Sequence, residues 1–572
     1  MSEKIRCLIE DIYGAEKAQE VYQRLSWMLE NRLKEITPPS VKGAGSLPVS
    51  EEDAFVITYG DQFRKAEAEP LAVLGQFADR YLRGLVSGIH ILPFFPYTSD
   101  DGFSVVDYRA VNPAWGTWKD IQAAGGRFRL MSDLVLNHCS ASSPWFKAFL
   151  RGEEPYGNYF ITVDEGTDLS MVARPRALPL LTPFHTSEGK KHVWTTFSAD
   201  QVDLNFACPE VLLEMIDVFL FHVRQGIQVI RLDAIAYLWK EIGHSCLHHA
   251  KTHAVVKLFR ALVDEYLPWV IILTETNVPH KENISYFGDG TDEAHMVYQF
   301  SLPPLVLDAF LRQDAGHLRT WAGTLPPPDG KTTFFNFLAS HDGVGVLPAQ
   351  GILSEEEIEQ LIGSVKNRGG LISYKATAAG KIPYEMNVNY LDAVAEASLP
   401  KELRAKKFLA AQAFLLIMPG VPGIYIHSVI GSGNWLEGVE QTGMNRTINR
   451  QKLDLDTVAE ELDRPGSLRN LVYNGYASML RVRRTRKAFH PGASFRVLPA
   501  AKGVFAAERI SPDRSQRLVC MINTSLKDEE CRLPTVFNGT TVVDILSSRE
   551  ITLSPQGSIP VPPLGVLWVE PL

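Results

Sequence analysis

The stretch VIRLDAIAYLWKE, residues 229–241, places Arg231 and Asp233 inside an otherwise apolar run. A charged side chain that loses its water without a partner costs on the order of several kcal/mol, so a strand buried in a core should avoid both residues. We therefore expect a buried strand to end here, with both charged groups at the mouth of a site.

Seven other runs rich in β-branched and aromatic residues resemble residues 227–233 and predict strands. The segments between them have apolar residues at every third or fourth position, which predicts helices. Residues 209–226 and 405–420 are two such helix-like segments. Eight alternations of strand and helix predict an α/β fold, a parallel (β/α)8 TIM barrel. The other predicted strands are AFVITYG from Ala54, GIHILPFFP from Gly88, FRLMSDLVLNH from Phe128, WVIILTE from Trp269, HMVYQFS from His295, TTFFNFLASHD from Thr332 and VPGIYIHS from Val421.

The intervals after the third and seventh predicted strands are too long for one helix each, and we expect inserted subdomains at about residues 139–207 and 343–402. The barrel as a whole is predicted over residues 46–490. Before it, residues 1–45 predict an N-terminal helical extension, with one additional helix followed by a Pro/Gly/Ser linker. Short strands with turn residues between them predict an antiparallel β domain over residues 491–572.

Composition excludes several kinds of partner. A formal net charge of −9 and a pI near 6.0 provide no basic surface for nucleic acid or an anionic membrane. There is no apolar run of about 18 residues and no secretory signal pattern in MSEKIRCLIEDIYG, so a cytoplasmic protein is expected. The residues leave the oligomeric state open between monomer and homodimer.

Cofactor and metal sites are not predicted either. The six cysteines lie far apart without a C-x-x-C pair, which indicates buried free thiols rather than a zinc site or disulfides. No dense run of oxygen ligands surrounds Asn137, so calcium is not expected.

Polar residues recur where the predicted strands end. For any one of them, a helix cap or a structural ion pair is the ordinary interpretation. For the whole set that interpretation fails, because so many carboxylates at one end of a barrel repel one another unless a ligand or a reaction requires them. The set comprises Asp133, Asn137 and His138 at the third strand, Arg231 and Asp233 at the fourth, Glu275 at the fifth, and His341 and Asp342 at the seventh.

Two of these carboxylates, Asp233 and Glu275, end adjacent strands and suit glycoside chemistry. One would attack the anomeric carbon, and the other would protonate the departing oxygen; a separation of about 5–5.5 Å would make the reaction retaining. Arg231 lies two residues before Asp233, on the same side of the strand, where it can hold that aspartate ionised.

Four motifs in order, DLVLNH, IRLDAIAY, ILTE and LASHD, resemble those of the α-amylase superfamily, glycoside hydrolase family 13, over about residues 50–490. The resemblance implies retaining chemistry on α-glucosides. It implies Asp233 as nucleophile, Glu275 as general acid/base and Asp342 as transition-state stabiliser. Sugar-positioning roles would fall to Arg231, His138 and His341, with Asp133 and Asn137 in support.

Further segments resemble the sucrose phosphorylase-like subfamily, among them FFPYTSDDGFSVVDY from Phe94, ARPRALPLLTPF from Ala173 and NRTINRQKL from Asn445. This resemblance implies that Asp100 pairs with Arg446 and that both grip the glucosyl hydroxyls, next to Phe103. It also implies that Arg176 approaches the phosphate and that Phe197 and Gln201 line the acceptor side.

The sequence after Glu275 departs from the V-H-x-Y-Y typical of sucrose phosphorylases. It reads TNVPHK, and TETNVPHKENISYFG resembles the glucosylglycerate phosphorylases of the same branch. The implied activity is reversible phosphorolysis of 2-O-α-glucosylglycerate to α-glucose 1-phosphate and glycerate. His280 and Lys281 are candidates for binding the acceptor, although a solvated loop lysine is the alternative.

Other functions stay open on the same residues. Sucrose, sucrose 6-phosphate and glucosylglycerol phosphorylase are alternatives that differ only in the acceptor. An α-glucoside hydrolase would use water in place of phosphate. A catalytically inactive binding subunit is a further alternative, although such a subunit would be expected to lack a catalytic carboxylate, and all three are present.

Overall fold

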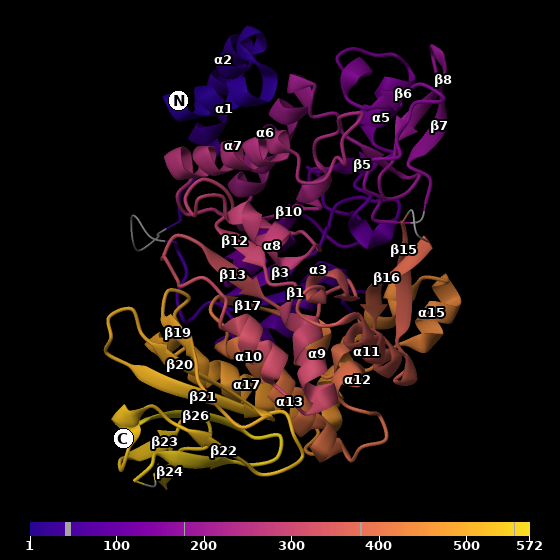
Figure 1. Cartoon of the computed structure of the whole chain (residues 1–572). Coiled ribbons are helices and arrows are strands. Elements are labelled where there is room, and N and C mark those ends of the chain that lie inside the picture. The colour runs from indigo at the N-terminus through magenta and orange to yellow at the C-terminus, as the bar shows by residue number, and fades with distance from the viewer. Residues whose placement is uncertain (40–46, 177, 378–379, 554) are drawn as a thin grey trace.

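A computed structural model describes residues 1–39, 47–176, 178–377, 380–553 and 555–572 (Figure 1). The predicted linker falls largely on residues 40–46, which lie outside the described residues. Across the described ranges, no helix has the length and apolar character needed to cross a bilayer.

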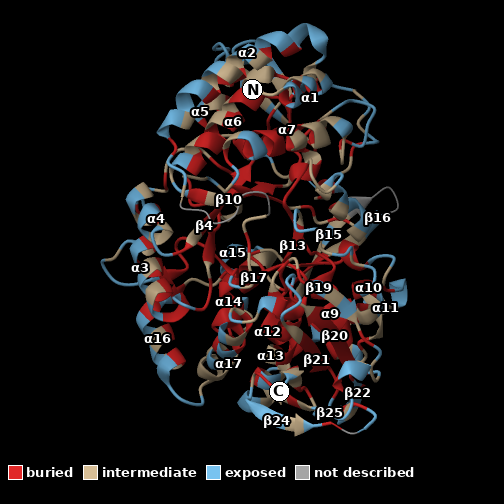
Figure 2. Cartoon of the chain, turned by 90° about the vertical axis from the view of Figure 1, so that its left-hand side faces the viewer, coloured by how far each residue is buried: buried red, intermediate tan, exposed pale blue. Residues whose placement is uncertain are grey.

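Eight parallel strands close into a barrel in the order β1-β17-β13-β12-β11-β10-β4-β3, which confirms the predicted TIM barrel. Each strand falls within one of the eight predicted runs. Their continuous apolar character follows from burial, because the inside of such a barrel is packed with side chains and helices cover its outside. Figure 2 shows the buried residues in red along the barrel strands. The strands are β1 Phe55–Thr58, β3 Gly88–Ile91, β4 Arg129–Val135, β10 Ile227–Asp233, β11 Ile271–Thr274, β12 Met296–Tyr298, β13 Thr333–Asn336 and β17 Val421–Tyr425.

The helices around the barrel begin with residues suited to helix starts. Proline occupies the first turn of α3, α6 and α9, where its missing N–H would have no partner within the helix. Both helices predicted in the sequence are present, as α6 and α13. The helices are α3 Pro70–Phe77, α4 Trp118–Gly125, α6 Pro209–Arg224, α7 Ala250–Tyr266, α9 Leu302–Arg312, α10 Gly316–Ala322, α13 Lys401–Ile417, α14 Ile426–Val429, α15 Leu436–Thr442, α16 Leu455–Asp463 and α17 Leu468–Arg483.

The N-terminal extension contains two helices, α1 Glu3–Tyr13 and α2 Ala15–Arg32, so the prediction of one helix was wrong. Gly14 separates them with a φ of 79°, a conformation that glycine adopts without the steric cost of a side chain. The buried face of α1 carries Ile5, Ile9 and Ile12, and α1 packs on α7. Of the six free cysteines, five are buried as predicted and Cys7 in α1 is exposed.

Two groups of short elements interrupt the barrel where inserted subdomains were expected. The first group, after β4, comprises β5 His138–Ser140, α5 Pro144–Leu150, β6 Thr162–Val163, β7 Leu181–Thr186, β8 Gly189–Trp194 and β9 Gln201–Asp203. The second group, after β13, comprises β14 Val344–Gly345, α11 Glu355–Asn367, β15 Leu371–Thr377, β16 Gly380–Asn387 and α12 Tyr390–Val394. The pair β2 Phe63–Arg64 and β18 Leu453–Asp454 forms a separate small sheet.

The C-terminal segment forms an antiparallel six-stranded sheet, in the order β19-β20-β21-β26-β23-β24, with β22 and β25 paired beside it (Figure 1). Arg509 in β20 is fully buried and donates 2.7 Å hydrogen bonds to the carbonyls of Ala488 and Ile417, which ties the sheet to α13. The strands are β19 Ser494–Val497, β20 Val504–Ile510, β21 Arg517–Asn523, β22 Glu529–Arg532, β23 Thr541–Asp544, β24 Arg549–Thr552, β25 Ser558–Val561 and β26 Val566–Pro571. The exact domain boundaries stay predictions.

Candidate active site

The end of β10 provides the two charges that interrupt its apolar run. Arg231 and Asp233 are both buried, and because side chains alternate along a strand they lie on the same side. The strand stops at Ala234, whose φ of 50° is left-handed. That turn aims the backbone N–H of Ala234 at Oε2 of Glu275, 3.1 Å away, so the fourth and fifth barrel strands are joined beside the two carboxylates.

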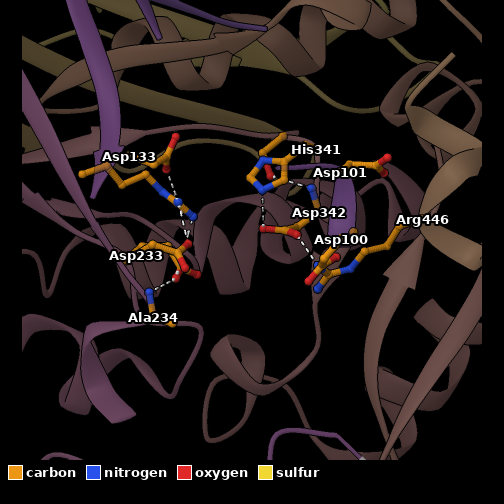
Figure 3. A network of polar contacts seen from close by, with 12 residues as sticks. Asp100, Asp101, Asp133, Asp233, Ala234, His341, Asp342 and Arg446 are labelled. Carbon is orange, nitrogen blue, oxygen red and sulfur yellow. Dashed lines mark hydrogen bonds and ion pairs between the residues drawn. The ribbon is translucent and has the colours of Figure 1, made fainter. Parts of the chain in front are cut away.

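Figure 3 shows the charged cluster, with Asp133 and Asp233 close together on one side and Asp342 beside Arg446 on the other. The ion pairs of Arg231 make it the centre of the first group. Its Nη1 forms ion pairs with Asp133 and with Asp233, the latter at 2.7 Å. Its Nη2 lies 3.8 Å from Oε2 of Glu275. Asp133 is itself held from the other side by His90, whose Nε2 lies 2.7 Å from it. One guanidinium thus fixes carboxylates from three strands, and it contacts Asp233 more closely than Glu275.

The pKa values of the two catalytic candidates are displaced upward. Burial raises the pKa of Asp233; Arg231 opposes the rise and the charge of Glu275 adds to it. Burial also raises the pKa of Glu275 against the opposing charge of Arg231. Because Arg231 lies closer to Asp233, the proton that these neighbouring carboxylates share is favoured on Glu275. The environment therefore suits Glu275 as an acid and Asp233 as an anion.

Asp342 lies opposite this pair and has a cationic partner of its own. Arg446, from the segment after β17, contacts its Oδ1 at 2.6 Å, and the ring of His341 lies 3.4 Å from its Oδ2. Burial would raise the pKa of Asp342, but the charge of Arg446, aided by those of Arg450 and Arg231, outweighs burial and the pKa is lowered. Asp342 is therefore an anion within the site.

The predicted partners of Asp100 and Arg446 differ from those in the structure. Arg446 directs its Nη1 to Asp342, and its Nε and Nη2 to Glu385, which accepts hydrogen bonds at 3.2 and 3.1 Å. Asp100 instead accepts a 2.8 Å hydrogen bond from Nη2 of Arg176, with no ion pair to Arg446 among the described residues. The predicted Asp100–Arg446 pair is thus wrong for this structure, because Glu385 of β16 supplies a competing carboxylate.

Two histidines border the same space in neutral form. Burial lowers the pKa of His138 to about 4 and that of His341 to about 3. His341 stacks on Phe103, with ring centroids 4.8 Å apart. Nε2 of His138 lies 3.0 Å from the carbonyl of Phe103 and 3.1 Å from Nε2 of Gln201. Both rings can therefore donate or accept hydrogen bonds without adding charge.

These groups surround a cavity with about 710 Å³ of empty space, including its open mouth. Asp133 and Asn137 lie behind the wall, where Lys240 holds Asn137 through a 2.5 Å hydrogen bond. The predicted residues that line the cavity are Asp100, Phe103, His138, Arg176, Phe197, Gln201, Arg231, Asp233, Glu275, His341, Asp342 and Arg446.

His280 and Lys281 do not line this cavity, so the structure does not support their predicted place at the acceptor. They begin the short helix α8 His280–Asn283. His280 packs near the rings of Trp321 and Phe334, and Lys281 is exposed.

Several residues of the site were not predicted. Three of them line the cavity, namely Tyr237, Asn277 and Tyr384. Two others bind charged residues of the site: Glu385 accepts a hydrogen bond from Arg446, and Arg450 donates one to Asp101. Arg450 is the second arginine of NRTINR, a signal that was available in the sequence. Tyr384 and Glu385 had no such signal, because they lie on a strand of the second insertion, remote in sequence from every motif.

Comparison with known families defines the class of this barrel. The α-amylase catalytic domain matches residues 78–321, which include β4, β10, β11 and the charged residues at their ends. Sucrose 6F-phosphate phosphorylase from Thermoanaerobacter thermosaccharolyticum has the same fold, with a TM-score of 0.73 at 24% identity over 84% of this chain and 96% of that one.

Two more similar relatives give the narrower family. Glucosylglycerate phosphorylase of Spirochaeta thermophila is 59% identical over 93% of this chain and 91% of its own length. Glucosylglycerate phosphorylase of Escherichia coli K12 is 44% identical over the full length of both chains. The chain belongs to glycoside hydrolase family 13, in the sucrose phosphorylase-like group that includes these glucosylglycerate phosphorylases.

Proposed function

We propose that this protein is a retaining phosphorylase that converts 2-O-α-glucosylglycerate and phosphate into α-glucose 1-phosphate and glycerate. The observation that carries the proposal is the unequal contact of Arg231 with two carboxylates, at 2.7 Å to the buried Asp233 and at 3.8 Å to the partly buried Glu275. It favours one anion and one acid on adjacent strands, as a double displacement requires. The names of the two relatives support the choice of glucosylglycerate.

In the first step, a carboxylate oxygen of Asp233 attacks the anomeric carbon while Glu275 gives its proton to the departing glycerate oxygen. A covalent glucosyl–Asp233 ester forms and glycerate leaves. In the second step, a phosphate oxygen attacks the same carbon and the carboxylate of Asp233 is released. If the attacking phosphate is protonated, Glu275 takes up that proton. Two inversions return the α configuration.

The other residues of the cavity have supporting roles in this proposal. The carboxylate of Asp342 would stabilise the positive charge that develops on the sugar. Asp100, His138, Arg231, His341, Arg446 and Phe103 would hold the glucosyl unit, and Phe197 and Gln201 would border the acceptor. Arg176 lines the cavity and is 31% exposed, and its guanidinium lies 5.5 Å from the ring of Phe197. It would meet the anionic acceptor.

The stereochemistry and the acceptor can be tested in one set of reactions. We expect proton NMR of the fresh products of phosphorolysis to show the α anomer of glucose 1-phosphate. With that donor, the rate of phosphate release should be highest with glycerate among glycerate, glycerol, fructose and fructose 6-phosphate. The β anomer would contradict the double displacement, a preference for fructose would favour the sucrose alternative, and a water reaction that dominates would favour a hydrolase.

Replacing Arg176 with alanine should weaken the use of both anionic acceptors. A guanidinium can meet a carboxylate or a phosphate with two parallel hydrogen bonds, each contributing about 1.5–3 kcal/mol when charged groups are involved. We therefore expect kcat/KM to fall roughly 10- to 100-fold for phosphate and for glycerate, on the basis of one such bond. The loss for glycerol should be much smaller.

Arg174→Ala is the matched control, because Arg174 lies two residues away, is exposed, and bonds the carbonyl of Leu178 outside the cavity. It should leave all three acceptors unchanged. Arg176 also bonds Asp100, so slow hydrolysis of glucose 1-phosphate by each variant measures any damage to the glucosyl side. Equal losses of kcat/KM for glycerol and glycerate would show that Arg176 maintains the shape of the site and does not recognise the charge of the acceptor.

A further inference from the structure

The turn that follows Glu275 is anchored at Thr276, the residue before Asn277. The hydroxyl of Thr276 donates a 2.6 Å hydrogen bond to Oδ1 of Asn283, and Nδ2 of Asn283 donates a 2.7 Å bond to the carbonyl of Tyr298. Thr276 and Asn283 are both buried, so this chain of bonds is shielded from water. Thr276 is thus held in place, and it lines the cavity together with Asn277.

Asn277 has a polar group that nothing in the protein uses. Its Oδ1 is buried and has no hydrogen-bond partner among the described residues, and its amide nitrogen forms no bond to them either. A polar group left in this way costs about 1–3 kcal/mol, and such groups in native proteins call for a specific explanation. Asn277 itself is only partly buried, so with Oδ1 turned into the wall its NH2 group is the part left to face the cavity.

Gly345 makes this arrangement possible. It lies in β14, at the start of the second insertion, and a Cβ atom at this position would lie 2.4 Å from Oδ1 of Asn277 and 3.0 Å from its Nδ2. Any side chain there would push the carboxamide away from its place. The insertion thus forms a part of the cavity wall that accommodates one amide, and on the adjoining strand β16 it adds Tyr384 to the same lining.

We propose that Asn277 determines acceptor specificity, because its NH2 group donates a hydrogen bond to the carboxylate of glycerate when that acceptor lies beside Glu275. The inference rests on the proposed function and deepens it. An NH2 donor suits an anionic acceptor at this place, since the carboxyl groups of Asp233, Glu275 and Asp342 in the same lining offer an anion no comparable donor. Asn277 lies two residues after Glu275, the acid/base beside which the departing oxygen must lie.

The test uses two substitutions at position 277 with glucose 1-phosphate as donor. Asn277→Ala removes the donor and should lower kcat/KM for glycerate about 10- to 100-fold, the loss of one hydrogen bond to a charged group. Asn277→Asp keeps the shape but sets a second anion against the carboxylate, so its loss for glycerate should be larger still. Both variants should stay within about threefold of the parent for glycerol and for water as acceptors.

Two further variants separate this role from a structural one. Gly345→Ala should displace the carboxamide of Asn277 without changing its chemical groups. It should therefore reproduce the loss of kcat/KM that is selective for glycerate. Lys281→Ala is the matched control, four residues further along on the exposed face of α8, and it should change nothing. Equal losses for glycerate, glycerol and water in both Asn277 variants would show that Asn277 only maintains the turn, and would overturn the inference.

The parent enzyme and the variants answer different questions. Rates of the parent with the acceptor panel decide the proposed function, and ratios of variant to parent decide the role of Asn277. A parent that prefers glycerate, with Asn277 variants that use it equally well, overturns only the inference. A parent with no turnover of glycerate overturns the proposed function and the inference together.

Discussion

Replacing Asp233 with asparagine is expected to lower kcat for glucosyl transfer by about a thousandfold or more, the usual scale for loss of a catalytic nucleophile. An amide cannot form the glucosyl ester, and the structure offers no substitute, because Asp342 is bound to Arg446 and Glu275 is needed as the acid. The loss of kcat should be the same with phosphate, glycerate and water as acceptors, since all three react with the same glucosyl ester.

The same substitution should leave the fold intact. Arg231 keeps its ion pair with Asp133, so its charge does not become unpaired. Burial raises the pKa of Asp233, so ionising this side chain, as a nucleophile requires, costs more free energy in the folded state than in the unfolded chain. Stability from this group is therefore present below the unfolded pKa near 4 and is lost as pH rises above it. Asparagine avoids that loss, so the melting temperature of the variant relative to the parent should rise between pH 6 and pH 8.

Activity and stability of the variant are measured separately, by phosphate release and by thermal unfolding followed with circular dichroism. Retention of more than a percent or so of parental kcat, against the thousandfold loss expected, would remove Asp233 as the nucleophile. A melting temperature that falls at both pH values would instead show that the inactive variant is damaged in its fold, and that the ion pair of Arg231 with Asp233 stabilises the protein.

Replacing Glu275 with glutamine is expected to produce a loss that depends on the leaving group. Glycerate is a poor leaving group without a proton, so cleavage of glucosylglycerate should fall by about a hundred- to ten-thousandfold, the range of general acid catalysis. Phosphate and fluoride are better leaving groups that need less proton donation from a general acid. Donors that carry them should therefore still glucosylate Asp233. The glucosyl ester should then accumulate, because a neutral acceptor such as glycerol lacks the base that removes its proton.

Mass spectrometry of the intact variant after reaction with α-glucosyl fluoride should show the mass of one added glucosyl unit. Azide, an anion that needs no base, should release it as a glucosyl azide. Glu282→Gln is the matched control, seven residues along in α8 and outside the cavity, and it should resemble the parent. Equal loss with glucosylglycerate and with the fluoride donor would contradict the acid/base role of Glu275.

The barrel and the catalytic candidates were predictable because their signals are local. A buried strand must be apolar along its whole length, so Arg231 and Asp233 could only mark its end, and six of the eight strand-end residues identified in the sequence line one cavity. Asp133 and Asn137, the other two, lie immediately behind them. The division of the N-terminal extension at Gly14 was missed because the helical pattern continues on both sides of one glycine.

The sequence by itself determined which chemical groups this protein brings to the end of its barrel, since residue type and strand period suffice for that. Only the tertiary structure decided which group meets which. Arg446 contacts Glu385, 61 residues away, and Asp100 contacts Arg176, 76 residues away. Among the described residues the Oδ1 of Asn277 has no hydrogen-bond partner, because Gly345 from the second insertion provides space beside it and no side chain. An ion pair forms only when its charged atoms come within about 3 Å of each other. For residues this far apart in sequence, the packing of the segments decides that distance, and no local sequence pattern records it.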